Sequence, residues 1–126
     1  MNFKNCDYDS LVNSYDNSLL YTDYLISEII KLIKNQDGRV GLIYVSDHGE
    51  SLGEDGIFTH GAVYSTAPRF QIHIPMIIYA NRESDVEILR GKQDDNLSHD
   101  NVSSSIFGFF GIETVEYNER LDLFKN

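Results

Sequence analysis

The sequence predicts an α/β fold, with helices flanking a mostly parallel sheet. The strongest observation is an apolar run, Val40–Ser46, that follows Asp37-Gly38 and is rich in β-branched residues. Such a run is typical of a strand buried on both faces of a parallel sheet. A helical pattern precedes it, and a second apolar run follows it. A helix, a Gly-containing turn and a buried strand form the helix-to-strand unit of α/β folds.

The first helix is predicted over Ser14–Asn35, after a polar and irregular segment, 1–12. Its apolar residues follow the i, i+4, i+8, i+11, i+12 spacing of one helix face. Gly38 is placed to stop the helix. The apolar face consists of Tyr21, Leu25, Ile29, Leu32 and Ile33, and the candidate N-caps are Asn13, Ser14 and Asp16.

The remaining chain predicts a long loop, one more strand and one more helix. Ser51–Arg69 is rich in Gly and small polar residues, and loops of this length are usually functional or disordered. Pro75 indicates that the second strand is Met76–Ala80. A charged connection, 81–96, leads to a helix over Ser98–Phe110. Ser98 is its N-cap, Gly111 is its stop, and its apolar face is Val102, Ile106, Phe109 and Phe110. The tail, 112–126, could add an edge strand or a short helix.

Length and charge limit the possible functions. The chain has 126 residues, enough for one domain. Ten basic and twenty acidic side chains give a formal charge of −10, which argues against nucleic acid and against an anionic membrane surface as partners. The sequence predicts no transmembrane segment and no signal peptide. An anionic substrate stays possible, because a bound metal would dominate the local field.

The end of the first strand is the candidate metal site. Asp47 and His48 follow the apolar run directly, where ligands bind in open α/β sheets, and both residue types bind zinc. Gly49 permits the break that would let neighbouring side chains reach one ion. His60 lies on the Gly-rich loop, which could fold it back over the site.

Four other residues could orient a ligand by hydrogen bonding to it. Two are carboxylates on the loop, and two are the remaining histidines of the chain. They are Glu50, Glu54, His73 and His99.

The inventory of strands is too small for a complete domain of this class. Two strands and two helices do not make a doubly wound sheet, which needs four or more strands to bury both faces. The single Cys6 cannot form an internal disulfide, so it is either a reduced, incidental cysteine or half of a disulfide whose partner this sequence lacks. We therefore expect either strands from the ends of the chain or a larger domain of which this chain is a part.

Several motifs, taken in order, resemble the catalytic domain of bacterial phosphoethanolamine transferases, which modify lipid A and related envelope acceptors. This family belongs to the sulfatase-like branch of the alkaline phosphatase superfamily. The most specific segment is the ten residues Val45–Glu54. The others are Asn13–Ser18, Thr59-His60-Gly61, Ala67-Pro68, Gln71–Met76, Leu97–Asn101 and Leu121–Phe124. The resemblance implies that residues 1–126 form the C-terminal portion of a sulfatase-like catalytic domain.

The resemblance also implies a chemistry. Asp47 and His48 resemble two catalytic zinc ligands, and His60 resembles a histidine that holds the phosphoethanolamine group or a second metal. In the family, a zinc-activated threonine attacks phosphatidylethanolamine and passes the head group to a lipid A-type acceptor hydroxyl. Family members are inner-membrane proteins with a periplasmic catalytic domain. Cys6 resembles half of a family disulfide.

No residue of this sequence matches the threonine nucleophile or the remaining ligands of the family. We therefore expect the chain alone to be inactive and to hold zinc weakly, because catalytic zinc usually has three protein ligands. An upstream polypeptide would complete the domain. Two alternatives stay open: a sulfatase or phosphodiesterase of the same superfamily, and a non-catalytic remnant domain.

Overall fold

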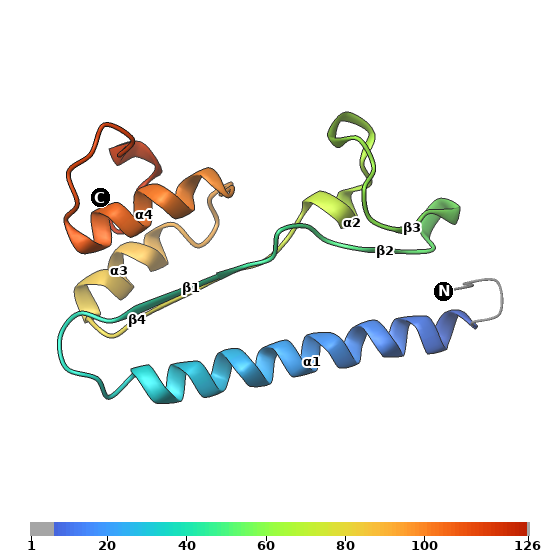
Figure 1. Ribbon diagram of the computed structural model, residues 1–126, viewed down its shortest axis with the longest axis horizontal. Helices are drawn as coiled ribbons and strands as arrows, with labels where there is room; N and C mark the ends of the chain where they lie inside the picture. Colours follow the sequence, from blue (N-terminus) through green and yellow to red (C-terminus); the bar gives the residue numbers. More distant parts are fainter. Residues whose placement is uncertain (1–6, 126) are drawn as a thin grey trace. The chain divides into compact units, whose positions relative to one another are not determined.

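The computed structural model describes residues 7–125, so Cys6 lies outside the described part of the chain. These residues form two compact units. The first comprises the chain up to Lys31 together with Val45–Met76, and the second comprises Leu32–Tyr44 and the chain from Ile77 onward. Figure 1 shows the elements of both units along the chain.

Helix α1 covers Tyr8–Ile33 and begins six residues before the predicted start. Asp7 caps it: Oδ1 of Asp7 accepts a hydrogen bond from the Ser10 amide at 2.9 Å, and Oδ2 accepts one from the Ser10 hydroxyl at 2.7 Å. These bonds favour the carboxylate and lower the pKa of Asp7. The prediction of an N-cap at Asn13, Ser14 or Asp16 was wrong, because the capping pair lies upstream of the apolar pattern that marks the helix.

The predicted apolar face of α1 is largely exposed within the described residues. Only Ile26 of this helix is buried, whereas Leu25 and Ile29 are 43% and 44% exposed. Leu32 is 70% exposed. The periodicity identified the helix correctly, but the described part of the chain does not cover its apolar face.

Strands β1, Gly41–Val45, and β4, Met76–Ala80, form a two-stranded sheet. The Asn81 amide, just after β4, donates to the Val40 carbonyl, just before β1, at 3.0 Å. The end of β4 therefore lies beside the start of β1, so this pair is antiparallel, and the expected parallel sheet is not confirmed in residues 7–125. No residue of β1 is buried there. An apolar run indicates that a strand can be covered on both faces, but not the direction of its neighbour.

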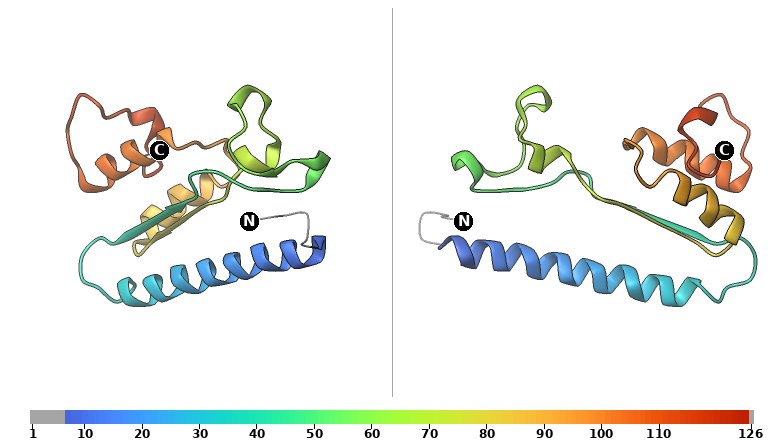
Figure 2. Two further views of the ribbon diagram at one scale, coloured as in Figure 1. Left: turned by 45° about the vertical axis from the view of Figure 1, so that its right-hand side comes forward. Right: turned by 180° about the vertical axis from the view of Figure 1, so that it is seen from behind.

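The predicted loop contains a small antiparallel hairpin (Figure 2). Strands β2, Ser51–Leu52, and β3, Phe58–Thr59, pair with Ser51 opposite Thr59. Glu54 accepts a hydrogen bond from the Leu52 amide at 2.7 Å, so its carboxylate stabilises the turn between the strands. Two 3-10 turns, Glu54–Gly56 and Tyr64–Thr66, and a short helix α2, Arg69–Ile72, complete this segment.

The second unit contains helix α3, Glu83–Gly91, where a solvated connection was predicted. The sequence of this segment is rich in charged residues, which is why it was predicted to be a solvated connection. One of these residues, Asp85, is only 4% exposed. Helix α4, Asp100–Phe110, ends at the predicted residue, but its N-cap residue is His99 and not Ser98. The Ser98 hydroxyl accepts from the Asp100 amide at 3.2 Å, and Gly111 ends the helix at φ 64°.

The buried face of α4 is polar, which corrects the predicted apolar face. Asn101, Ser104 and Ser105 are buried, whereas Ile106 and Phe110 are 42% and 69% exposed. The tail explains the difference. The Ser105 hydroxyl accepts from the Leu123 amide at 3.0 Å, and the Asn101 side chain donates to the Leu121 carbonyl at 3.0 Å. The tail thus pairs with α4 through hydrogen bonds, which hydrophobic periodicity does not detect.

The tail itself contains a 3-10 helix, Glu119–Leu121, in agreement with the short-helix alternative. Its Leu123 and Phe124 are among the few buried apolar side chains of the described residues. Within residues 7–125, no helix combines the length and apolar character needed to cross a membrane.

Candidate metal centre

The first part of the site is the turn that follows β1. The His48 amide donates to Oδ1 of Asp47 at 3.0 Å, and Nδ1 of His48 lies 2.9 Å from the Gly49 carbonyl oxygen. A carbonyl oxygen can only accept, so the proton of this imidazole is on Nδ1. The lone pair of Nε2 on His48 is therefore available to a metal.

Gly49 is held against helix α2. Its amide donates to the Gln71 carbonyl at 2.9 Å. A Cβ at this position would lie 2.0 Å from the Phe70 carbonyl oxygen, well inside van der Waals contact. The glycine predicted to allow a break in the strand is thus required for a different reason: it permits close approach of two backbones.

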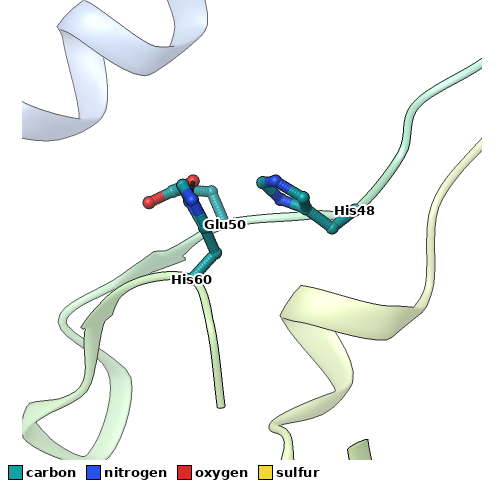
Figure 3. Close-up of side chains that lie close together, drawn as sticks. All are labelled: His48, Glu50 and His60. Atoms are coloured by element: carbon teal, nitrogen blue, oxygen red, sulfur yellow. Dashed lines mark hydrogen bonds and ion pairs between the residues drawn. The ribbon is translucent and has the colours of Figure 1, made fainter. Parts of the chain in front are cut away.

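The second part of the site is His60, which follows β3. Nδ1 of His60 lies 2.9 Å from Oε2 of Glu50, so the imidazole donates to the carboxylate and its Nε2 is available as a ligand. The rings of His48 and His60 lie 4.0 Å apart, centroid to centroid, at 33°. Figure 3 shows the side chains of His48, Glu50 and His60 gathered at one place. The loop therefore returns His60 to the strand end.

The donor set fits a transition metal. Among the described residues, one ligand atom each from His48, Glu50 and His60 lies within 4.8 Å of the other two. Asp47 lies outside this group, and its side chain is 87% exposed, but its Oδ2 lies 3.6 Å from Nε2 of His48. Two ligand atoms on a tetrahedral zinc lie about 3.4 Å apart, given bonds of about 2.0–2.1 Å. The Asp47–His48 pair is therefore spaced to share one ion.

Two of the remaining candidate residues lie outside this group. His73 follows α2 and is exposed. His99 immediately precedes α4 in the second unit. Neither belongs to the group of neighbouring ligand atoms found in the described residues.

Two residues near the site were not singled out from the sequence. Gln71 is buried and bonds to the segments on which Glu50 and His60 lie. Thr59, next to His60, has a φ of 67°, which is rare for a β-branched residue. A lone glutamine or threonine carries no pattern that would reveal such a role.

The structure thus places a group of possible metal ligands at the turn after β1 and on the loop that returns to it. The sequence profile of the sulfatase family matches residues 2–112, and the chain belongs to that family. Within the family, its relatives are phosphoethanolamine transferases. Phosphoethanolamine transferase EptA of Salmonella typhimurium is 37% identical in an alignment that covers 95% of this chain and 24% of the relative.

Solved structures of phosphoethanolamine transferases also match this chain. The C-terminal periplasmic domain of phosphoethanolamine transferase EptC from Campylobacter jejuni matches with a TM-score of 0.93 and 46% identity, over 98% of this chain and 41% of that one. The integral membrane protein lipooligosaccharide phosphoethanolamine transferase A from Neisseria meningitidis matches with a TM-score of 0.88 and 36% identity, over 97% of this chain and 24% of that one. The chain thus spans about a quarter of the length of such full-length relatives.

Proposed function

We propose that this chain is the zinc-binding portion of a phosphoethanolamine transferase that moves phosphoethanolamine from phosphatidylethanolamine to a lipid A-type acceptor. One observation carries the proposal. The Nδ1 atoms of His48 and His60 are both hydrogen-bonded to oxygen, and an Asp47 carboxylate oxygen lies 3.6 Å from Nε2 of His48. The resemblance to transferases over nearly the whole chain supports the same assignment.

In this proposal, Asp47 and His48 hold the metal. When bound, zinc would act as a Lewis acid that neutralises charge on phosphoryl oxygens and lowers the pKa of the attacking hydroxyl. Glu50 accepts a hydrogen bond from the Nδ1–H of His60 and thereby fixes the orientation of the ring. With its ring held in this way, His60 would face the phosphoethanolamine group or a second metal.

The rest of the reaction needs groups for which this sequence has no counterpart. We propose that the threonine nucleophile and the remaining ligands come from another polypeptide segment, and that this chain alone is inactive in transfer. In the complete domain, β1 and β4 would belong to a larger, mostly parallel sheet. No described residue of β1 is buried and Ile77 of β4 is 40% exposed, which supports a larger sheet. By resemblance, the site would face the periplasm at the inner membrane.

A chimera tests the function directly. Residues 7–125 replace the matched segment in the periplasmic domain of the Campylobacter jejuni transferase, and head-group transfer to an acceptor is measured against release of free phosphoethanolamine to water. We expect transfer to be retained, since the two structures match closely. Replacing His48 with alanine should reduce transfer by at least about 100-fold, because a ligand contact in the transition state is lost.

His73→Ala is the matched control, because this exposed histidine lies outside the group of ligand atoms. It should leave transfer within about two-fold, since exposed residues away from a site contribute little. Release of phosphoethanolamine to water without transfer would favour the hydrolase alternative. A folded chimera without either activity would favour the non-catalytic alternative and contradict the proposal.

A further inference from the structure

We propose that Gln71 is a positioning residue that holds His48, Glu50 and His60 at one place; as a role in catalysis, this rests on the function proposed above. Gln71 lies in α2 and is only 5% exposed. It touches no candidate ligand atom itself. Its bonds instead reach the backbone or side chain of residues next to each of the three site residues.

The side chain of Gln71 binds both parts of the β2–β3 hairpin. Its Nε2 donates to the Ser51 hydroxyl at 2.9 Å and to the Thr59 carbonyl at 3.1 Å. Its Oε1 accepts from the Ala62 amide at 3.3 Å. Ser51 is adjacent to Glu50, whereas Thr59 and Ala62 lie on either side of His60-Gly61. One amide group therefore fixes the segment that carries Glu50 and both ends of the turn that carries His60.

The backbone of Gln71 holds the remaining residue. Its carbonyl accepts from the Gly49 amide at 2.9 Å, and Gly49 lies between His48 and Glu50. All segments of the site thus converge on one residue of α2. A buried glutamine with both ends of its amide satisfied is costly to replace, because each partner would be left without a bond.

Thr59 shows why such an anchor is needed. Its φ of 67° lies in the left-handed region, which is strained and which a β-branched side chain rarely adopts. The surrounding structure must enforce this conformation, and the bond from Gln71 to the Thr59 carbonyl is one such constraint. The strained residue immediately precedes His60 and turns the chain there. Release of this anchor should let His60 move away from His48.

The test is made on the full chain without metal, by NMR. The neighbouring rings of His48 and His60 should give a nuclear Overhauser cross-peak between their ring protons, because their centroids are 4.0 Å apart. In Gln71→Met, which keeps the length of the side chain and removes its hydrogen bonds, we expect this cross-peak to disappear. We also expect amide exchange at Ala62 to accelerate at least about ten-fold, because its acceptor is lost.

Gln36→Met is the matched control. Gln36 also donates from its side chain to a backbone carbonyl, that of Leu32 at 3.1 Å, but it is exposed and lies in the second unit. It should leave the cross-peak unchanged. If circular dichroism shows that Gln71→Met does not fold, Ser51→Ala is used in its place to test the role of Gln71. This substitution removes only one hydrogen bond of Gln71, the one to the Ser51 hydroxyl. It should weaken the cross-peak, and an unchanged cross-peak would overturn the proposal.

A second measurement, the affinity for Co²⁺, distinguishes a failure of this inference from a failure of the proposed function. Loss of a residue that orients metal ligands typically weakens metal affinity by about 10–100-fold. Gln71→Met should therefore weaken Co²⁺ binding by that factor relative to Gln36→Met. If the unaltered chain binds no Co²⁺, the proposed metal site fails, while the cross-peak still decides the role of Gln71. A cross-peak that persists in folded Gln71→Met would show that Gln71 does not position the site.

Discussion

Replacing Asp85 with alanine is expected to lower the free energy of unfolding by about 3 kcal/mol. Asp85 pairs with Arg39 through two hydrogen bonds, Nε to Oδ2 at 2.9 Å and Nη2 to Oδ1 at 2.8 Å. The guanidinium also donates to the Phe109 carbonyl at 2.7 Å and lies 4.4 Å from the Phe109 ring centroid. Without Asp85, this partly buried cation keeps its place but loses its counter-charge.

The bonds to Asp85 also raise the pKa of Arg39, so the guanidinium stays charged over the usual pH range. Urea unfolding followed by circular dichroism measures the loss. Glu83→Ala is the control, because Glu83 pairs with Arg90 at 3.6 Å between side chains that are 75% and 69% exposed. Exposed pairs contribute about 0–1 kcal/mol. Equal effects of the two substitutions would contradict the assigned role of the Arg39–Asp85 pair.

Replacing Gly49 with alanine is expected to separate the two halves of the candidate metal centre. The new Cβ would meet the Phe70 carbonyl oxygen at 2.0 Å, so the turn after β1 must move away from α2. The hydrogen bond from the Gly49 amide to Gln71 is then lost as well. We expect a destabilisation of roughly 3 kcal/mol, at the upper end for overpacking.

Gly91→Ala is the matched control for this steric effect. A Cβ at Gly91, the last residue of α3, meets no atom within 4 Å. This substitution should be neutral or slightly stabilising, since alanine is a better helix former than glycine. The Gly49 variant should lose the cross-peak between the rings of His48 and His60, and the Gly91 variant should keep it. A folded Gly49→Ala protein with that cross-peak intact would contradict the close approach.

The elements that the sequence predicted well are those with a local signal. Pro75 correctly marked the start of β4, and Gly111 correctly marked the end of α4, because both residues restrict the backbone directly. The start of α1 was missed because the apolar pattern begins after the Asp7 cap. Helix α3 was missed because Asp85, which the sequence suggests is exposed, is buried by its long-range pair with Arg39.

The residues of the candidate site likewise divide into those with a signal in the sequence and those without one. His48 and His60 were singled out from position and resemblance, and the structure brings them together with Glu50. His73 and Asp47 lie outside that group, and Glu54 serves a turn instead. Gln71 and Thr59 could not be predicted, because their roles depend on hydrogen bonds between residues as far apart as Gly49 and Gln71, and on one unusual φ angle. Such contacts have no periodic signature in a sequence.

The most direct test of the central claim is titration of the full chain with Co²⁺, followed by its visible absorption and by dialysis. A partial metal site that contains His48 predicts an absorption band that appears on titration, disappears on dialysis, and is absent in His48→Ala. We expect the chain to hold the ion weakly, because it supplies too few ligands for a complete catalytic site. A band that persists in His48→Ala, or one ion per chain that survives dialysis, would contradict the claim that this chain carries part of a transferase metal centre.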